Sequence, residues 1–153
     1  MTIALALLIG LVAGSRTFAA PAGVSWAGHL GWLDLGGTAL AFLASTWARG
    51  LLTLLALVEL VVDQLPSTPS RTVPVQFGGR IASGALSGAA IGAARGAPVG
   101  GLVAGVVGAI VGTLTGSAFR ARLARAFGSD HLAAFIEDAV AIAGVVLIAV
   151  ALR

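Results

Sequence analysis

Four acidic residues lie inside apolar runs of the sequence, where a carboxylate is unusual. Glu59 and Asp63 are four residues apart in the run ALVELVVDQ, a spacing that places both on one face of a helix. Glu137 and Asp138 lie near the start of the last apolar run. An acid within a membrane span costs at least about 2.5 kcal/mol, so it is usually paired, protonated or in contact with a water-filled cavity.

Three interpretations of these acids follow, and the third is interfacial placement with no special role. In the first, Glu59 and Glu137 take up and release charge along an ion or proton pathway, with Asp63 and Asp138 as neighbours. In the second, the acids form structural pairs with arginine that only fix helix packing. The candidate partners are Arg16, Arg49, Arg80 and Arg120, of which Arg16 and Arg120 are the expected counter-charges.

The remaining reactive residue types form no recognisable catalytic or metal-binding pattern. The chain has no cysteine, which excludes disulfides, thiolate metal sites and cysteine nucleophiles. His29 and His131 are isolated, without a His or Cys one helical turn away. The serines belong to no known His–Asp arrangement. Without lysine, the glycine-rich region cannot be a P-loop. We therefore expect no enzyme, no cofactor and no metal.

The composition indicates an integral membrane protein. Of 153 residues, 58% are hydrophobic and 10% charged, and the mean hydropathy is +1.04. Soluble domains carry roughly 25% charged residues. The length allows one domain, 1–153, with halves 1–65 and 78–153 joined by a proline-rich loop at 66–77. All nine basic residues are arginines, mostly single between apolar runs, which is typical of topology signals and not of a nucleic-acid surface.

The apolar runs predict an all-α, multi-pass bundle with five or six membrane segments. We expect the first run, 2–14, to be a retained helix, which is short for a bilayer and can span one if it continues past Arg16 toward Pro21. The run 38–65 is either one long tilted helix or two short helices joined near Arg49. We favour two helices, because Gly50 follows the charge and Trp47 precedes it. A basic stretch at 119–130 should face the membrane surface.

Glycines recur every four residues in two successive runs between 84 and 116. This spacing aligns small residues on one helix face and lets helix backbones approach closely in lipid. Arg95 and Pro98 mark a turn between the two runs. We predict a glycine-zipper hairpin over roughly 80–116, packed through Gly84, Gly88, Gly92, Gly96, Gly108, Gly112 and Gly116.

The two ends of the chain also resemble each other weakly. Gly14-Ser15 and Gly116-Ser117 are each followed by His-Leu at the same offset, and ALVE (56–59) matches AFIE (134–137) in type. Weak internal similarity is typical of small transporters built from repeats around a midplane site. Chance is the alternative, because a chain rich in Ala, Gly, Leu and Val matches itself easily.

Several segments together resemble one known family. They are GLVAGSRTFAAP, VELVVDQLPSTPSRT, GGRIASGALSGAA and AFIEDAVAI. With them the chain resembles the bacterial family of small integral membrane proteins catalogued as domain of unknown function 4126. The resemblance implies a multi-pass protein of the bacterial inner membrane and implies no activity.

The expected function is a small membrane transporter or channel for an ion or small solute, with a homodimer as a candidate assembly. The alternative is a non-catalytic membrane scaffold or an accessory subunit of a larger membrane complex. A water-filled cavity reaching Glu59 would favour transport, and a dry core with every acid paired to arginine would favour the scaffold. The lipid bilayer is the expected partner in both, and nucleic acid in neither.

If 38–65 is a hairpin, the arginines divide between two sides of the membrane. The positive-inside rule then puts the N-terminus outside the cytoplasm. The cytoplasmic set is Arg16, Arg71, Arg80, Arg120, Arg122 and Arg125, and the other set is Arg49, Arg95 and Arg153.

Overall fold

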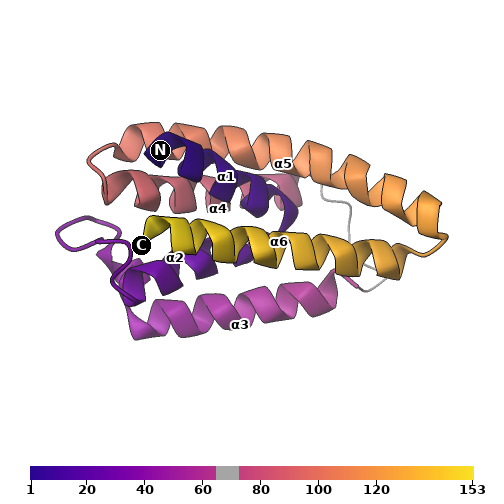
Figure 1. Ribbon diagram of the computed structural model, residues 1–153, viewed down its shortest axis with the longest axis horizontal. Coiled ribbons are helices and arrows are strands. Elements are labelled where there is room, and N and C mark those ends of the chain that lie inside the picture. Colours follow the sequence, from indigo (N-terminus) through magenta and orange to yellow (C-terminus); the bar gives the residue numbers. More distant parts are fainter. Residues whose placement is uncertain (65–72) are drawn as a thin grey trace.

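The computed structural model describes residues 1–64 and 73–153, and every regular element in those ranges is helical (Figure 1). The predicted all-α class is confirmed. Both chain termini lie toward the same end of an elongated bundle, and the α5–α6 turn lies at the other end. The elements are α1 (Thr2–Ser15), α2 (Ala19–His29), a 3₁₀ turn η1 (Ala41–Ala44), α3 (Thr46–Val62), α4 (Pro74–Ala93), α5 (Pro98–Phe127) and α6 (Asp130–Leu152).

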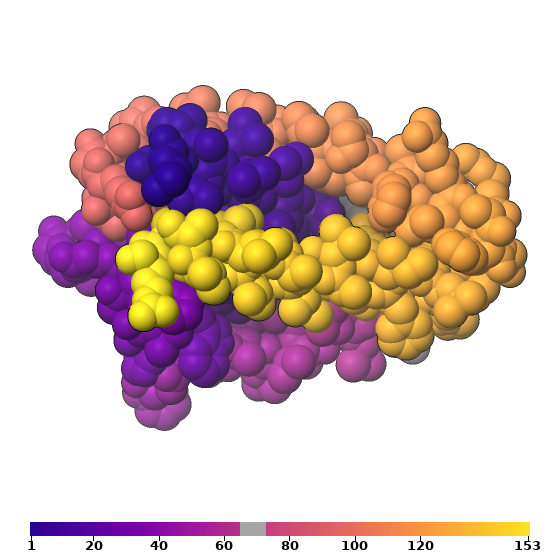
Figure 2. Space-filling view, in the orientation of Figure 1, coloured from indigo at the N-terminus to yellow at the C-terminus, as the bar shows by residue number. Residues whose placement is uncertain are grey.

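Two of the described helices are long and apolar enough to cross a membrane. They are α5, with 30 residues, and α6, with 23; α1 is a shorter apolar helix of 14 residues. Figure 2 shows α6 lying along the bundle, with α1 and α5 on one side and α2 and α3 on the other. Large apolar side chains point outward from α3 and α6, including Leu54, Leu57 and Leu147.

The helices α1 and α2 form a hairpin whose tip lies inside the bundle. Gly10 packs on Gly105, and Gly14 packs on Ala109 and on the next turn of α5, at Gly112 and Thr113. The contacts advance along both helices in the same direction, so α1 runs parallel to α5. In contrast, α2 packs on α6 through Gly23 and Val145 and returns toward the end that holds the termini. The continuation past Arg16 that would let the first helix span a bilayer therefore does not occur. Arg16 is extended (φ −137°, ψ 110°), and the chain reverses between residues 16 and 18.

The run 38–65 does not form two helices joined at Arg49. One helix, α3, covers residues 46–62, and Arg49 lies in its first turn. Ser45 is the N-cap and accepts a hydrogen bond from the amide of Ala48 at 3.1 Å, which fixes the start of the helix. The guanidinium of Arg49 lies 4.8 Å from the centroid of the Trp26 ring, so α2 holds a charge that sequence reasoning assigned to a turn.

The predicted loop at 66–77 is also shorter than expected. Pro74 is the first residue of α4, where its missing N–H costs no helical hydrogen bond. Residues 74–77 are thus helical. Pro66, Pro69 and Arg71 lie outside the described residues.

Glycines line the contacts of α5 with α4 and with α1. A Cβ on Gly84 would lie 2.6 Å from the carbonyl oxygen of Gly105, and one on Gly88 would lie 2.8 Å from the Cα of Gly105. Such distances leave no room for a side chain, so the backbones are in direct contact. Gly92 meets the start of α5 in the same way, whereas Gly108 and Gly112 pack against Leu11 of α1.

Two of the predicted packing glycines lie elsewhere. Gly96 is in the α4–α5 turn with φ +72°, a conformation that favours glycine, and a Cβ there would meet nothing within 4 Å. Its role is to turn the chain. Gly116 lines a surface hollow beside Leu8 and Phe119.

Candidate functional site

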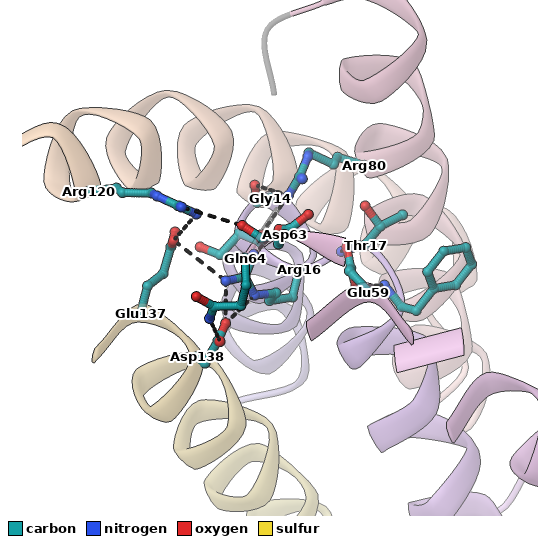
Figure 3. A network of polar contacts seen from close by, with 12 residues as sticks. Gly14, Arg16, Thr17, Glu59, Asp63, Gln64, Arg80, Arg120, Glu137 and Asp138 are labelled. Atoms are coloured by element: carbon teal, nitrogen blue, oxygen red, sulfur yellow. Dashed lines mark hydrogen bonds and ion pairs between the residues drawn. The ribbon is translucent and has the colours of Figure 1, made fainter. Parts of the chain in front are cut away.

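Arg16 is the centre of a buried charge cluster at the tip of the α1–α2 hairpin (Figure 3). Its Nε donates to Oδ1 of Asp138 at 2.6 Å, and its terminal nitrogens bind Asp138 and Asp63. Oε2 of Glu137 lies 3.8 Å from Nη2. The guanidinium is fully buried, so its charge is balanced by carboxylates from α6 and from the residue that follows α3.

Arg120 extends the cluster along α5. It binds Asp130 at 2.7 Å, approaches Oε2 of Glu137 at 3.9 Å and donates to the backbone carbonyl of Asp63 at 3.4 Å. Gln64 donates to Oδ2 of Asp138 at 3.1 Å. These contacts join the end of α3 to both α5 and α6.

Arg80 and the C-terminus of α1 form a second group of contacts. The Arg80 side chain is buried, and its Nη1 donates to the carbonyl oxygens of Gly14 at 3.0 Å and Ser15 at 2.6 Å. The last carbonyls of a helix have no partner within the helix and carry partial negative charge. Arg80 thus stabilises the end that the break at Arg16 exposes.

Glu59 performs the matching task at the start of α2. Its Oε1 accepts from the amide of Thr17 at 2.6 Å, and its Oε2 accepts from the amide of Phe18 at 2.8 Å. The first amides of a helix also lack partners, and a carboxylate there is stabilised by the helix dipole. A carboxylate in an apolar run is explained by this contact: Glu59 of α3 caps the N-terminus of α2.

Two surface hollows reach Glu59. We call the first the α2–α3–α6 groove; its volume is about 430 Å³ and its walls are mainly apolar. It extends from Trp26 and Trp32 to Arg16 and Glu59, between Leu57 and Leu60 of α3 and Ile142 and Val145 of α6.

The second, the α3–α4 hollow, has a volume of about 360 Å³. It is lined by Thr17, Asp63 and Gln76 among apolar residues of α3 and α4. Glu59 lines both spaces, and among the described residues no other does so.

The structure therefore separates the predicted site residues into two groups. Arg16, Asp63, Asp138, Glu137 and Arg120 meet in one cluster, as drawn in Figure 3, whereas Glu59 lies to one side against the α2 amides.

Arg49 belongs to neither group, and His29 faces the carbonyl of Ala44 at 3.4 Å. Among the described residues no group of three His, Asp or Glu side chains is arranged to hold a metal ion.

Sequence reasoning missed several members of the site. The amides of Thr17 and Phe18 and the carbonyls of Gly14 and Ser15 are backbone groups, which no side-chain pattern reveals. Gln64 was not considered, although it directly follows Asp63. Its position beside an acid at the end of an apolar run could have identified it as a partner in the cluster.

Comparison with known proteins gives a family but no activity. The family model described as "Domain of unknown function (DUF4126)" matches residues 3–152. No curated protein matches the chain. No solved structure matches it either. The resemblance drawn from the sequence motifs is thus confirmed for the family itself.

Proposed function

We propose that this chain, which belongs to the DUF4126 family of domains of unknown function, is a small membrane transporter or channel for an ion or small solute. The observation that carries the proposal is the position of Glu59. It is a half-buried carboxylate at the junction of two hollows, held there by two backbone hydrogen bonds. In the proposed pathway, a solute moves between the α2–α3–α6 groove and the α3–α4 hollow past Glu59.

The helical hairpin supports the same proposal. Non-helical backbone at membrane depth is tolerated where it is buried in protein or lines a cavity, and transporters often place their sites at such exposed helix ends. In this chain the break lies at Arg16, and its two ends are bound by Arg80 and Glu59. We infer that release of the Glu59 carboxylate from the amides of Thr17 and Phe18 would let a solute pass between the two hollows.

The proposed membrane arrangement has six segments in the bacterial inner membrane. The α1–α2 hairpin enters and leaves on one side, α3 to α6 cross in turn, and a glycine zipper packs α4 on α5. Arg120, Arg122 and Arg125 occur toward the α5–α6 end, whereas Arg95 and Arg153 belong to the opposite end. The positive-inside rule therefore places the α5–α6 turn in the cytoplasm and both termini outside. The internal repeat and the homodimer remain predictions.

A reporter fused after Arg153 tests this orientation. We expect activity only from a reporter enzyme that works outside the cytoplasm. Activity from a reporter that works only in the cytoplasm would overturn the arrangement.

The scaffold remains the second candidate, because a specific observation favours it. Arg16 is surrounded by Asp63, Glu137 and Asp138, which is the pairing expected where charges serve only to fix packing. Glu59 distinguishes the two functions, since its hydrogen bonds are to backbone amides and it faces the two hollows.

Flux through reconstituted vesicles tests the proposal. Vesicles containing wild-type protein should dissipate at least one imposed gradient of protons, sodium, potassium, chloride or an alkylammonium ion faster than empty vesicles. Glu59→Gln should abolish that flux, whereas Asp34→Asn, which changes an exposed acid in the loop after α2, should leave it unchanged. Wild-type vesicles that match empty ones for every gradient would favour the scaffold, and unchanged flux in Glu59→Gln would remove Glu59 from the pathway.

A further inference from the structure

The α2–α3–α6 groove has the dimensions of a ligand site and an uneven distribution of polarity. Its volume of about 430 Å³ lies within the range of small-molecule pockets. Alanine, leucine, valine and isoleucine side chains form most of its walls. Such walls offer few hydrogen-bond partners, so a ligand that carries an apolar tail matches them better than a wholly polar one.

Most polar groups of the groove already have hydrogen-bond or ion-pair partners within the protein. Trp26 Nε1 donates to Oγ1 of Thr53 at 3.0 Å, and Thr53 donates to the carbonyl of Arg49 at 2.7 Å. Arg16 is fully buried, and its Nε and both terminal nitrogens already contact carboxylates. It therefore offers little to an anionic ligand.

Glu59 is the exception at the inner end of the groove. A carboxylate has about four lone-pair sites, and the two amides of the α2 N-terminus use two of them. The remaining sites can accept hydrogen bonds from a ligand. A cationic donor also supplies the opposite charge that a half-buried carboxylate requires.

We propose that the groove binds a single-tailed amphiphile with a primary ammonium head, the head on Glu59 and the alkyl tail along α2, α3 and α6 toward Trp26 and Trp32. This inference rests on the proposed transport function and names its substrate class. Charge complementarity at Glu59 selects the head, and the apolar walls select the tail.

Tryptophan fluorescence provides the test, because two of the three tryptophans line the groove and Trp47 is 89% exposed outside it. Trp47→Phe protein in phosphatidylcholine nanodiscs is titrated with dodecylammonium that carries a terminal bromine as a quencher. The dodecanoate and dodecanol analogues serve as anionic and neutral probes. We expect saturable quenching by the ammonium probe, at least about tenfold tighter than by the carboxylate probe.

Three variants in the same background locate the head and the tail. Glu59→Gln should weaken ammonium binding at least about tenfold and leave dodecanol binding unchanged, which shows that the groove is intact. Ala56→Phe, which fills the groove, should weaken both probes, whereas Ala139→Phe on the exposed face of α6 should weaken neither.

Equal affinities for the ammonium and carboxylate probes, or ammonium binding unchanged in Glu59→Gln, would overturn the inference. If the ammonium probe binds but the protein supports no flux in vesicles, the amphiphile site is supported and transport is not. If the protein supports flux but the probe does not bind saturably, transport is supported and this substrate class is not.

Discussion

Two regions of the bundle are built in opposite ways. In the contact of α5 with α4 and α1, backbones touch directly at glycines, and nine residues of α4 are buried, which is nearly half of that helix. In the region formed by α2, α3 and α6, α3 has no buried residue at all, and hollows open on both sides of Glu59. Close packing leaves no space for a ligand or for movement, so the glycine-lined region is the rigid part of the bundle. In contrast, α3 borders the two hollows.

The charged residues connect these two regions. Arg80 extends from α4 to the end of α1, and Arg16 extends from the hairpin tip to Asp63 and Asp138. Few apolar side chains hold α3 in place, so the ion pairs at its end contribute a large share of its attachment. The following substitutions test this contrast.

The largest effect is expected for Arg16→Gln. The change removes the guanidinium that pairs with Asp63 and Asp138 and leaves the buried Asp138 carboxylate without its arginine, at a cost of about 3–5 kcal/mol. Thermal unfolding in detergent, followed by circular dichroism, should show a large fall in Tm. Arg122→Gln, at an exposed position of the same residue type, is the control. A Tm near that of wild type would mean that the cluster does not hold α3.

Gly88→Leu should have the next largest effect. The new side chain would collide with the backbone of Gly105 and force α4 from α5, with an expected cost of about 2–3 kcal/mol. The yield of monodisperse protein and the Tm measure the loss. Gly78→Leu is the matched control, since a Cβ at that position of α4 meets nothing within 4 Å. Equal stability of the two variants would place the Gly88 face toward lipid.

Glu59→Gln should destabilise the protein moderately. A Gln side chain has one acceptor oxygen, so one of the amides of Thr17 and Phe18 loses its partner, at a cost of about 1–2 kcal/mol. Hydrogen exchange should report the loss locally, as faster exchange at the start of α2. Unchanged exchange there would contradict the capping role.

The smallest effect is expected on the outer face of α3. Leu54 is 58% exposed, so Leu54→Ala should change the free energy of unfolding by no more than about 0.5 kcal/mol. Ile91→Ala in α4 removes a fully buried side chain of similar size and should cost about 2–5 kcal/mol. If Leu54→Ala lowers the free energy of unfolding as much as Ile91→Ala does, then the outer face of α3 is packed against another surface.

The sequence predicted the regular parts of this structure better than its irregular ones. The spacing of the glycines placed small residues where helices meet, and the acids in apolar runs pointed to partners such as Arg16. The break after Ser15 was missed because Gly14 is one of many glycines in apolar runs and no Pro lies at the break. It depends on Arg80 and Glu59, which are distant in sequence and bind backbone atoms there.

Residues near Arg49 show the converse error. Gly50 and the charge suggested a turn, but Ser45 caps the helix and the Trp26 ring accepts the charge, so the helix continues through Gly50. Local residue types thus predicted a helix end near Gly50 that the structure does not have, because a contact with α2 stabilises the helix there.

The most direct measurement of the central claim is the accessibility of the two hollows on either side of Glu59. The chain has no cysteine, so Ala56→Cys reports the α2–α3–α6 groove and Gln76→Cys reports the α3–α4 hollow without interference. Each variant in sealed vesicles is treated with a cationic, membrane-impermeant methanethiosulfonate added to one side at a time. A pathway through Glu59 predicts that both cysteines react, from opposite sides of the membrane. Two cysteines that stay unmodified from either side would show a dry core and contradict the account.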